Sequence, residues 1–168
     1  MTDTAHIIRP AGFGDAEGIF ALIQEFKDEL LPRSMSDIVK NIDRFVVADI
    51  GGAIVGTVSW QILPEIGAPR NPSVEIKSLS VAARCHRRGV GSALVRAAIY
   101  RIDQLRPEQI IVLTFAPEFF GSLGFKKVPK EKLIHKIYNG CVNCSKYDSP
   151  FTCPEIAMVL DMRHAAPA

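Results

Sequence analysis

Apolar residues along the chain recur with two different periods, and these periods predict both strands and helices. The runs at 6–11, 44–49 and 53–62 alternate or are rich in β-branched residues, as strands are. Residues 74–81 (VEIKSLSV) alternate in the same way. Residues 109–115 (QIIVLTF) are continuously apolar, so we expect this strand to lie in the centre of a sheet.

Helical spacing, with apolar residues three and four positions apart, marks two longer segments. The first is expected to begin at Asp15, and the second to follow Gly89 and Gly91. Two shorter helices are expected, one capped by Ser36 and one ended by Gly124. The apolar faces of the longer helices would contain Ile19, Leu22, Ile23, Phe26 and Leu30 in the first, and Val90, Leu94, Ala97, Ala98, Ile102 and Leu105 in the second.

Turn residues connect these elements into one order. The IGG segment at 50–52 joins two β-rich runs and predicts a hairpin. Residues 63–73 are rich in Pro and Gly and indicate a loop, while the run at 155–162 is expected to be the last strand. The order β-α-α-β-β-β-α-β-α-β is typical of a mixed α/β layer fold. Without an internal repeat or a flexible linker, residues 1–168 are expected to form a single domain.

The composition favours a packed globular protein and excludes two classes of partner. Lys and Arg number 20 and Asp and Glu 18, so the net charge is only +2 and no nucleic-acid partner is expected. Apolar residues make up 48% of the chain, yet no apolar run approaches the ~20 residues that span a bilayer, so no membrane partner is expected. The first ten residues lack the layout of a signal peptide, which predicts a cytoplasmic location.

The segment ARCHRRGVGSAL (83–94) combines basic side chains with glycines where a predicted strand is followed by a helix. At such a junction the first N–H groups of the helix and its dipole form an anion site. Glycine lets the backbone approach a phosphate closely. An ordinary turn with a solvated basic edge would have the same composition. The pattern G-x-x-x-x-G-K-[ST] is absent, and Leu94 stands where G-x-G-x-x-G needs its third glycine.

These residues resemble the acyl-CoA-binding motif of the GNAT acyltransferase superfamily, usually written [Q/R]-x-x-G-x-[G/A]. Here EIKSLSV is followed by RCHRRGVGSAL, and the later FFGSLGF is similar to the family's second landmark, F-Y-x-x-x-G-F. The resemblance covers the whole chain and implies an α/β (α+β) GNAT acyltransferase fold. That fold has a central mixed sheet of about six or seven strands, helices on both faces and splayed central parallel strands. His86 departs from the motif at its first position, where the family has Gln or Arg.

The resemblance implies acetyl-CoA as the cosubstrate. Main-chain N–H groups of residues 86–92 would hold its pyrophosphate, and the backbone of residues 79–81 would pair with its pantetheine arm as if with another strand. The implied cofactor-binding residues are Leu79, Ser80, Val81, His86, Arg87, Arg88, Gly89, Val90, Gly91, Ser92, Phe119 and Phe120.

Acetylating an amine requires a base for the substrate ammonium, donors for the tetrahedral oxyanion and a proton for the departing thiolate. By resemblance to histone-acetylating members, the base would be Glu75. The main-chain N–H of Leu79 or Ser80 would be the oxyanion donor. A purely structural pairing of Glu75 with Lys77 on the same strand face is the alternative.

The group that protonates the thiolate is not identified by the resemblance. Many family members have a tyrosine where this chain has Phe120, and phenylalanine has no proton to give. The proton would come from solvent or from another group, for which the candidates are Tyr138, His135 and a cysteine.

A narrower resemblance concerns the acceptor amine. VLTFAPEFFGSLGFKKV, HKIYNGCVNCSKY, EIAMVLD and the earlier LLPRSMSDI are similar to short, stand-alone N-acetylglutamate synthases, which serve arginine biosynthesis. The resemblance implies L-glutamate as the acceptor, whose carboxylates need Arg or Lys partners. The candidate substrate-binding residues are Lys77, Arg33 and Thr114, with Lys127 and Lys136 also available. L-Glutamine, another small amine, a protein N-terminus and a non-catalytic acetyl-CoA sensor stay open, as does a homodimer.

Three of the four cysteines, Cys141, Cys144 and Cys153, lie within 13 positions, and His135 precedes them. The spacing C-x-x-C lets two thiolates reach one zinc ion, with Cys153 and His135 as further ligands. A structural zinc site has two tight cysteine pairs more often than one, so we favour free thiols and expect no resident metal. Cys85, beside the glycine turn, is expected to be a small apolar filler.

Overall fold

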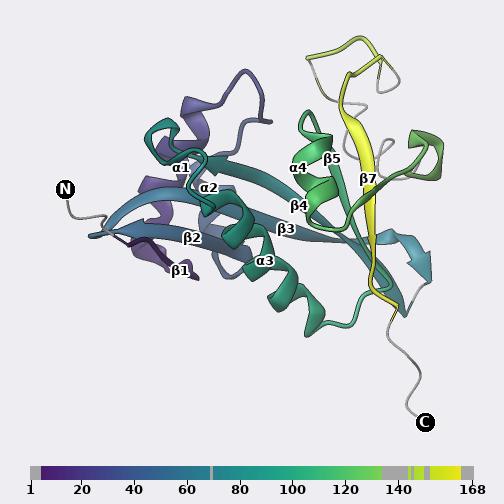
Figure 1. The fold of residues 1–168 in the computed structure, drawn as a ribbon, viewed down its shortest axis with the longest axis horizontal. Helices are drawn as coiled ribbons and strands as arrows, with labels where there is room; N and C mark the ends of the chain where they lie inside the picture. The colour runs from purple at the N-terminus through teal and green to yellow at the C-terminus, as the bar shows by residue number, and fades with distance from the viewer. Residues whose placement is uncertain (1–4, 69, 134–143, 145, 150–151, 164–168) are drawn as a thin grey trace. The chain divides into compact units, whose positions relative to one another are not determined.

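The structure is a computed structural model, and it describes residues 5–68, 70–133, 144, 146–149 and 152–163 of the 168-residue chain (Figure 1). Within these ranges one sheet contains seven strands in the order β1-β2-β3-β4-β5-β7-β6. The strands are β1 (Ile7–Pro10), β2 (Phe45–Ile50), β3 (Ala53–Ala68), β4 (Asn71–Val81), β5 (Gln109–Thr114), β6 (Lys126–Lys127) and β7 (Ile156–Asp161).

The sheet is mixed, as the predicted fold class requires. The pairs β1/β2, β2/β3, β5/β7 and β6/β7 are antiparallel, whereas β4 and β5 are parallel. The helices are α1 (Ala16–Glu25), α2 (Met35–Lys40), α3 (Val90–Asp103) and α4 (Pro117–Ser122), with short 3-10 turns at Phe13–Asp15, Ile42–Arg44, Ala83–Cys85 and Lys130–Leu133. The predicted α/β (α+β) class, a mixed sheet of six or seven strands with helices, is therefore confirmed.

The chain divides into two compact units. The first contains Met1–Trp60 and Ile76–Arg101, and the second contains Gln61–Glu75 and Ile102–Ala168. The long strands β3 and β4 belong in part to each unit, and each unit is described below by itself. That the whole chain behaves as one domain stays a prediction.

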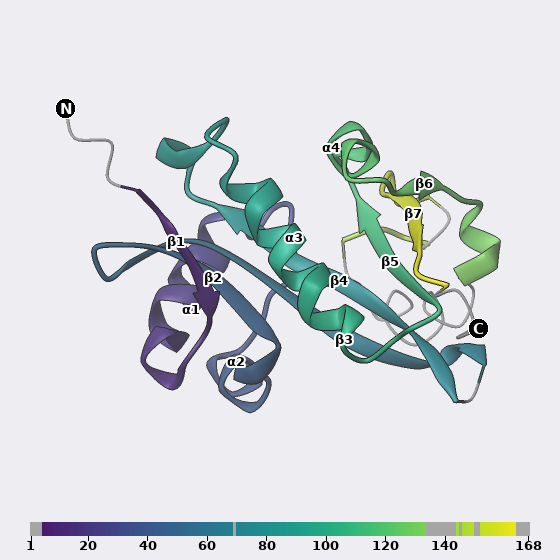
Figure 2. The same cartoon turned by 60° about the horizontal axis from the view of Figure 1, so that its bottom comes forward.

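In the first unit, helices cover both faces of the sheet. On one face, α1 and α2 bury Ile19, Ile23 and Ile38 against Phe45 and Val47 of β2. The third helix, α3, covers the other face, as Figure 2 shows. The buried side chains of α3 are Val90, Leu94, Val95, Ala98 and Ile102, so the predicted apolar face is confirmed over most of its length.

A β-bulge at Val55 lets β3 contact helices on both faces. Asp49 pairs with Ile54 and Ala48 with Gly56, so Val55 is the extra residue. The Ile54 side chain lies against Gly18 of α1, where an added Cβ would be 2.8 Å from Ile54 Cγ1. A Cβ added to Gly56 would be 2.8 Å from Cδ1 of Leu94 in α3.

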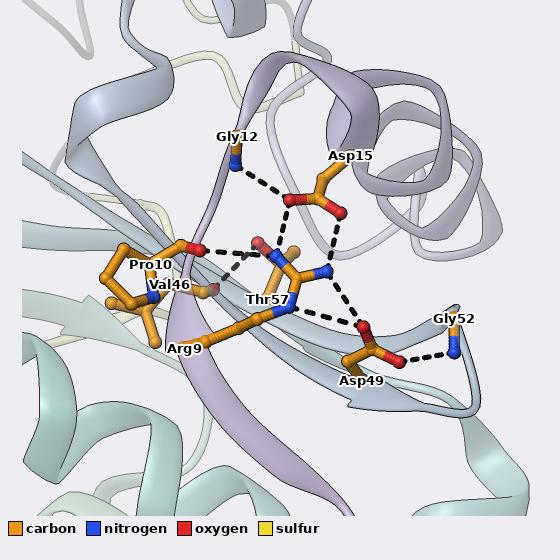
Figure 3. Close-up of polar contacts among 8 residues, drawn as sticks. All are labelled: Arg9, Pro10, Gly12, Asp15, Val46, Asp49, Gly52 and Thr57. Atoms are coloured by element: carbon orange, nitrogen blue, oxygen red, sulfur yellow. Dashed lines mark hydrogen bonds and ion pairs between the residues drawn. The ribbon is translucent and has the colours of Figure 1, made fainter.

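An ionic cluster connects β1 to the start of α1 and to the hairpin between β2 and β3 (Figure 3). Arg9 donates to both carboxylate oxygens of Asp15, at 2.7 and 2.8 Å, and to Oδ2 of Asp49 at 2.8 Å. The same carboxylates accept from the backbone N–H groups of Gly12 and Gly52. The hydrogen bonds from Arg9 lower the pKa of both carboxyl groups from the ordinary aspartate value.

In the second unit, β5 is central, as its apolar sequence predicts. Ile110, Ile111 and Val112 are buried, and Ile111 packs in a cluster with Leu63, Ile66, Leu133 and Ala157. The parallel pairing of β4 with β5 joins Val74 to Ile110 and Glu75 to Ile111. In the described residues it stops there, although both strands continue, and this agrees with the predicted splay of the central strands.

The predicted loop at 63–73 is wrong, because β3 continues to Ala68 and β4 begins at Asn71. Leu63 and Ile66 are buried in the apolar cluster of the second unit, which explains why this segment is ordered as a strand. Pro64 is tolerated because β2 pairs with β3 only as far as Ser59, and no other strand of the described residues pairs with the later part of β3 on that side.

Smaller details of the predicted elements also differ from the structure. The cap of α2 is Ser34 rather than Ser36, since Ser34 Oγ accepts from Asp37 N at 3.1 Å. Phe26 and Leu30 lie beyond the end of α1, and Leu105 lies beyond α3 and is exposed. Asp15 is the N-cap residue of α1, as predicted, although its side chain binds Arg9 and Gly12 rather than the first N–H groups of that helix. The short strand β6 was not predicted.

Candidate functional site

The loop between β4 and α3 contains backbone geometry that ordinary turns avoid. Arg87 has a φ of 58° and Gly89 a φ of 77°, on either side of Arg88. A residue with a side chain loses about 1–2 kcal/mol of stability in this left-handed conformation, so the rest of the loop must hold Arg87 in it. All three residues are exposed, and α3 begins immediately afterwards at Val90.

This loop has both donors and space for an anion. The helix starts with the bond from Ala93 N to Gly89 O at 3.0 Å, so the N–H groups before Ala93 have no partner within the helix. A Cβ added to Gly89 would have no heavy atom of the described residues within 4 Å. The helix N-terminus, together with the Arg87 and Arg88 side chains, can therefore hold a phosphate group.

His86 is attached to the end of β4 rather than pointing away from it. Its Nε2 lies 2.7 Å from the carbonyl oxygen of Val81, and its ring stacks on Phe26 with the centroids 6.5 Å apart. Because a carbonyl only accepts, Nε2 must carry the hydrogen. Donation to a phosphate oxygen, as expected for the first motif position, would then require Nδ1 of the protonated ring.

The end of β4, just before this loop, contains two serines with unusual features: Ser78 has a positive φ, and Ser80 is buried without a hydrogen-bond partner among the described residues. Ser78 has a φ of 55° inside the strand, which breaks the regular alternation there. Ser80 is 3% exposed, and its Oγ has no hydrogen-bond partner among the described residues. Since an unsatisfied buried hydroxyl is costly, we expect Ser80 to meet a ligand or an ordered water. Leu79 and Val81, beside it, are half-buried.

The candidate base, Glu75, is 4% exposed and lies in the second unit. Its Oε2 accepts a hydrogen bond of 2.9 Å from Nε2 of Gln61, on the neighbouring strand β3. Sequence reasoning missed Gln61. The signal was available, because Gln61 has the longest polar side chain in residues 53–62, a run that reads as a strand.

Arg33 is held in a defined orientation in the first unit. Its Nε donates to Asp37 Oδ2 at 2.6 Å, and its Nη1 donates to Ser59 Oγ at 2.8 Å and to Ser78 Oγ at 3.3 Å. The guanidinium carbon lies 5.0 Å from the centre of the Phe45 ring. The structure thus brings Arg33 to the irregular part of β4, three residues before Val81.

Other predicted site residues have local structural partners. Phe120 is buried and packs edge-to-face on Phe119 and Phe125, with ring centroids 5.0 and 5.3 Å apart. Thr114 ends β5, and its Oγ1 accepts from Ala116 N at 2.9 Å. Lys77 is half-buried, and its carbonyl oxygen accepts from Ser59 Oγ. Lys127 is exposed in β6.

The cysteine cluster is described only in part. His135, Lys136, Tyr138 and Cys141 lie outside the described residues. Cys153 lies near Glu155, to which its Sγ is 3.7 Å away, and burial raises the pKa of its thiol. No group of three or more His, Cys, Asp or Glu side chains in the described ranges could hold a metal ion. Because two of the candidate ligands are not described, the zinc hypothesis stays untested.

None of the helices that the structure describes has the length and apolar character to cross a membrane.

Cys85, which was expected to be a small apolar filler, is 3% exposed and belongs to the buried apolar residues.

Comparisons with known proteins agree on one family. The model of the Acetyltransferase (GNAT) family matches residues 16–125. An uncharacterized N-acetyltransferase of Chlorobaculum tepidum is 32% identical over 154 residues, which are 90% of this chain and 94% of that protein. An amino-acid acetyltransferase of Mycobacterium tuberculosis is 24% identical over 98% of this chain and 90% of its own length.

A solved structure shows the same fold. N-Acetylglutamate synthase from Neisseria gonorrhoeae, complexed with coenzyme A and N-acetyl-glutamate, superposes with a TM-score of 0.78 and 21% identity. The match covers 97% of this chain but only 36% of that one, so the chain spans about a third of the length of that enzyme. Since the family model spans more than half of the sequence and the Chlorobaculum protein matches nine tenths of it, the chain belongs to the acetyltransferase (GNAT) family.

Proposed function

We propose that this acetyltransferase moves the acetyl group of acetyl-CoA to the α-amino group of L-glutamate, as an N-acetylglutamate synthase. The observation that carries the proposal is Arg33, a guanidinium fixed by Asp37 and Ser59 and hydrogen-bonded to Ser78 of β4. Ser78 precedes Leu79, the proposed oxyanion donor. A cation fixed at this point suits an acceptor that carries a carboxylate.

The role of acetyl-CoA is supported by the loop from His86 to Ser92. Main-chain N–H groups at the start of α3, with Arg87 and Arg88, would bind the pyrophosphate. The backbone of residues 79–81 would pair with the pantetheine arm. Ser80 fits this proposal, because its buried hydroxyl lacks a partner among the described residues and would gain one. The Neisseria relative was solved with coenzyme A, which supports the same cosubstrate here.

The proposed chemistry assigns a role to each group. The Glu75 carboxylate takes a proton from the substrate ammonium, and the freed amine attacks the thioester carbonyl carbon. The N–H of Leu79 or Ser80 donates to the oxygen that becomes negative in the tetrahedral intermediate. The carbon–sulfur bond then breaks, and the nitrogen of the intermediate loses its second proton. The departing thiolate takes up a proton from solvent or from another group, because Phe120 has none to give.

One observation favours a second acceptor. Asp37 Oδ2 lies 2.6 Å from Arg33 Nε, so the positive charge of Arg33 is already offset in part. A neutral side-chain amide needs less charge than a carboxylate, and this favours L-glutamine as the runner-up.

A panel assay tests the proposal. Release of free CoA thiol would be measured with saturating acetyl-CoA and each of the amino acids, a polyamine, an aminoglycoside and a peptide with a free N-terminus. L-Glutamate should give the highest kcat/KM, L-glutamine should come next, and the product should be N-acetylated at the α-amino group. Preference for a polyamine, an aminoglycoside or the peptide would overturn the assignment. As an independent check, the gene should restore growth of an arginine auxotroph that lacks this step.

A further inference from the structure

Glu75 is a carboxylate in an environment that opposes charge. It is 4% exposed, and the β5 residue paired with it is Ile111, flanked by the buried Ile110 and Val112. An ionised carboxylate in such surroundings needs hydrogen-bond donors to remain charged. Gln61 provides one, since its Nε2 lies 2.9 Å from Glu75 Oε2.

The two residues come from adjacent strands of the same compact unit. Glu75 is also the last residue of β4 that pairs with β5 in the described residues. Neighbouring segments of the two flanking strands, residues 59–64 of β3 and 109–114 of β5, contain no titratable side chain. On β4 itself, the nearest charged residue along the sequence is Lys77.

We propose that Gln61 is a positioning residue for Glu75: its side-chain amide fixes the orientation of the carboxylate and favours the ionised form that accepts the substrate proton. The proposal rests on the proposed function of Glu75 as the general base. An amide N–H donates and cannot accept, so it stabilises the carboxylate more than the carboxylic acid. The amide is unchanged by the reaction, while the proton moves from the substrate nitrogen to Glu75 and then to solvent.

The proposal predicts a change in the pH profile of kcat/KM for the acceptor. Gln61→Met keeps the length of the side chain and removes the donor, so the acidic limb should move up by about one pH unit, the equivalent of one hydrogen bond to a charged group. Gln61→Glu places a second carboxylate beside Glu75, so the limb should move further in the same direction. The KM for acetyl-CoA should change less than twofold in both variants.

Two controls separate this role from packing. Gln24→Met makes the same change at an exposed position of α1 and should leave the profile unaltered. In a Glu75→Gln background, Gln61→Met should cause no further loss of kcat, because the group that it positions is gone. Circular dichroism and thermal melting would identify folded variants, and Gln61→Glu, which keeps the shape of glutamine, serves if Gln61→Met does not fold.

The outcomes distinguish the role of Gln61 from the role of Glu75. Equal activity loss at every pH in folded Gln61 variants, with an unmoved acidic limb, would overturn the positioning role while Glu75 could still be the base. Near-normal turnover of Glu75→Gln would instead overturn the base role on which this inference rests. The test of Gln61 does not depend on which amine is the acceptor, because the pH profile is measured with whichever amine the panel assay shows to be best.

Discussion

The Nε2 atom of His86 lies 2.7 Å from the carbonyl oxygen of Val81, and this contact ties the start of the α3 loop to the end of β4. We expect His86→Ala to raise the KM for acetyl-CoA about fivefold, the value of one ordinary hydrogen bond, because the loop loses its attachment to the strand. His86→Gln keeps a side-chain N–H donor and should stay within about twofold of the parent. Steady-state kinetics in acetyl-CoA measure both, and an unchanged KM for His86→Ala would contradict the expectation.

The left-handed conformation of Gly89 gives a second test. Gly89→Ala should cost about 1–2 kcal/mol of stability and weaken CoA binding, because the new Cβ strains the turn and occupies the space left for the phosphate. Gly51, at a φ of 60° in the β2–β3 turn, is the matched control, since a Cβ there also has no described heavy atom within 4 Å. Gly51→Ala should therefore lose similar stability and no affinity. Calorimetric titration with CoA compares them, and equal CoA affinity in both would remove the loop from the binding site.

The base role of Glu75 predicts a large effect on rate. Glu75→Gln should lower kcat by about 10²–10⁴-fold, the usual contribution of a general base. The loss should shrink at high pH, where more of the substrate amine is already neutral. Glu17→Gln, at an exposed position of α1, should leave kcat within experimental error. A Glu75→Gln enzyme with near-normal turnover and an unaltered pH response would reassign the carboxylate to a structural role.

The ionic cluster at Arg9 predicts acid sensitivity with a definite sign. Arg9 lowers the pKa of Asp15 and Asp49, so both carboxyls stabilise the fold above the ordinary aspartate pKa of about 4. That stabilisation is lost as pH falls through their lowered native values. Arg9→Met should therefore be less stable than the parent at pH 7, and the difference should narrow at a pH below that ordinary value. Urea unfolding at both pH values measures it, and a pH-independent difference would show that Arg9 acts only through packing.

The cysteines give a fifth prediction. We expect protein purified without a histidine tag to contain far less than one zinc per chain. Burial raises the pKa of the Cys153 thiol, so fewer thiolates are present at pH 7 and its alkylation should be slow there and accelerate as the pH rises. Metal analysis and time-resolved alkylation with mass spectrometry test both points. Stoichiometric zinc would contradict the free-thiol hypothesis.

Local sequence patterns predicted the elements whose contacts are close in sequence. The face of α3 with Val90, Leu94 and Ala98 follows from helical spacing alone, and these side chains are buried. The pattern failed at Leu105 because α3 ends at Asp103 and Arg106 adopts a φ of 51°, so the same period no longer points to the core. The strand at 63–68 was hidden by Pro64, which is tolerated where β3 has no strand of the described residues paired on one side.

The contacts that orient the candidate site join residues far apart in the sequence, and sequence spacing does not predict them. Arg33 and Ser78 lie 45 positions apart, and Ser78 has the irregular φ of 55° within β4. Gln61 and Glu75 lie 14 positions apart and meet because β3 and β4 are neighbours in the sheet. The family motif indicated the residues 75–92, whereas the partners that orient them came from the fold.

On the two sides of the bulge at Val55, a glycine on one element faces a large side chain on another. At one pair, the helix residue Gly18 makes room for Ile54 of the strand, and at the other, the strand residue Gly56 makes room for Leu94 of the helix. The packing therefore constrains the combined side-chain volume of each pair rather than the residue at either position alone. A selection that randomised one glycine alone should return glycine, while one that randomised both members should recover reversed pairs, with the large side chain on the opposite element.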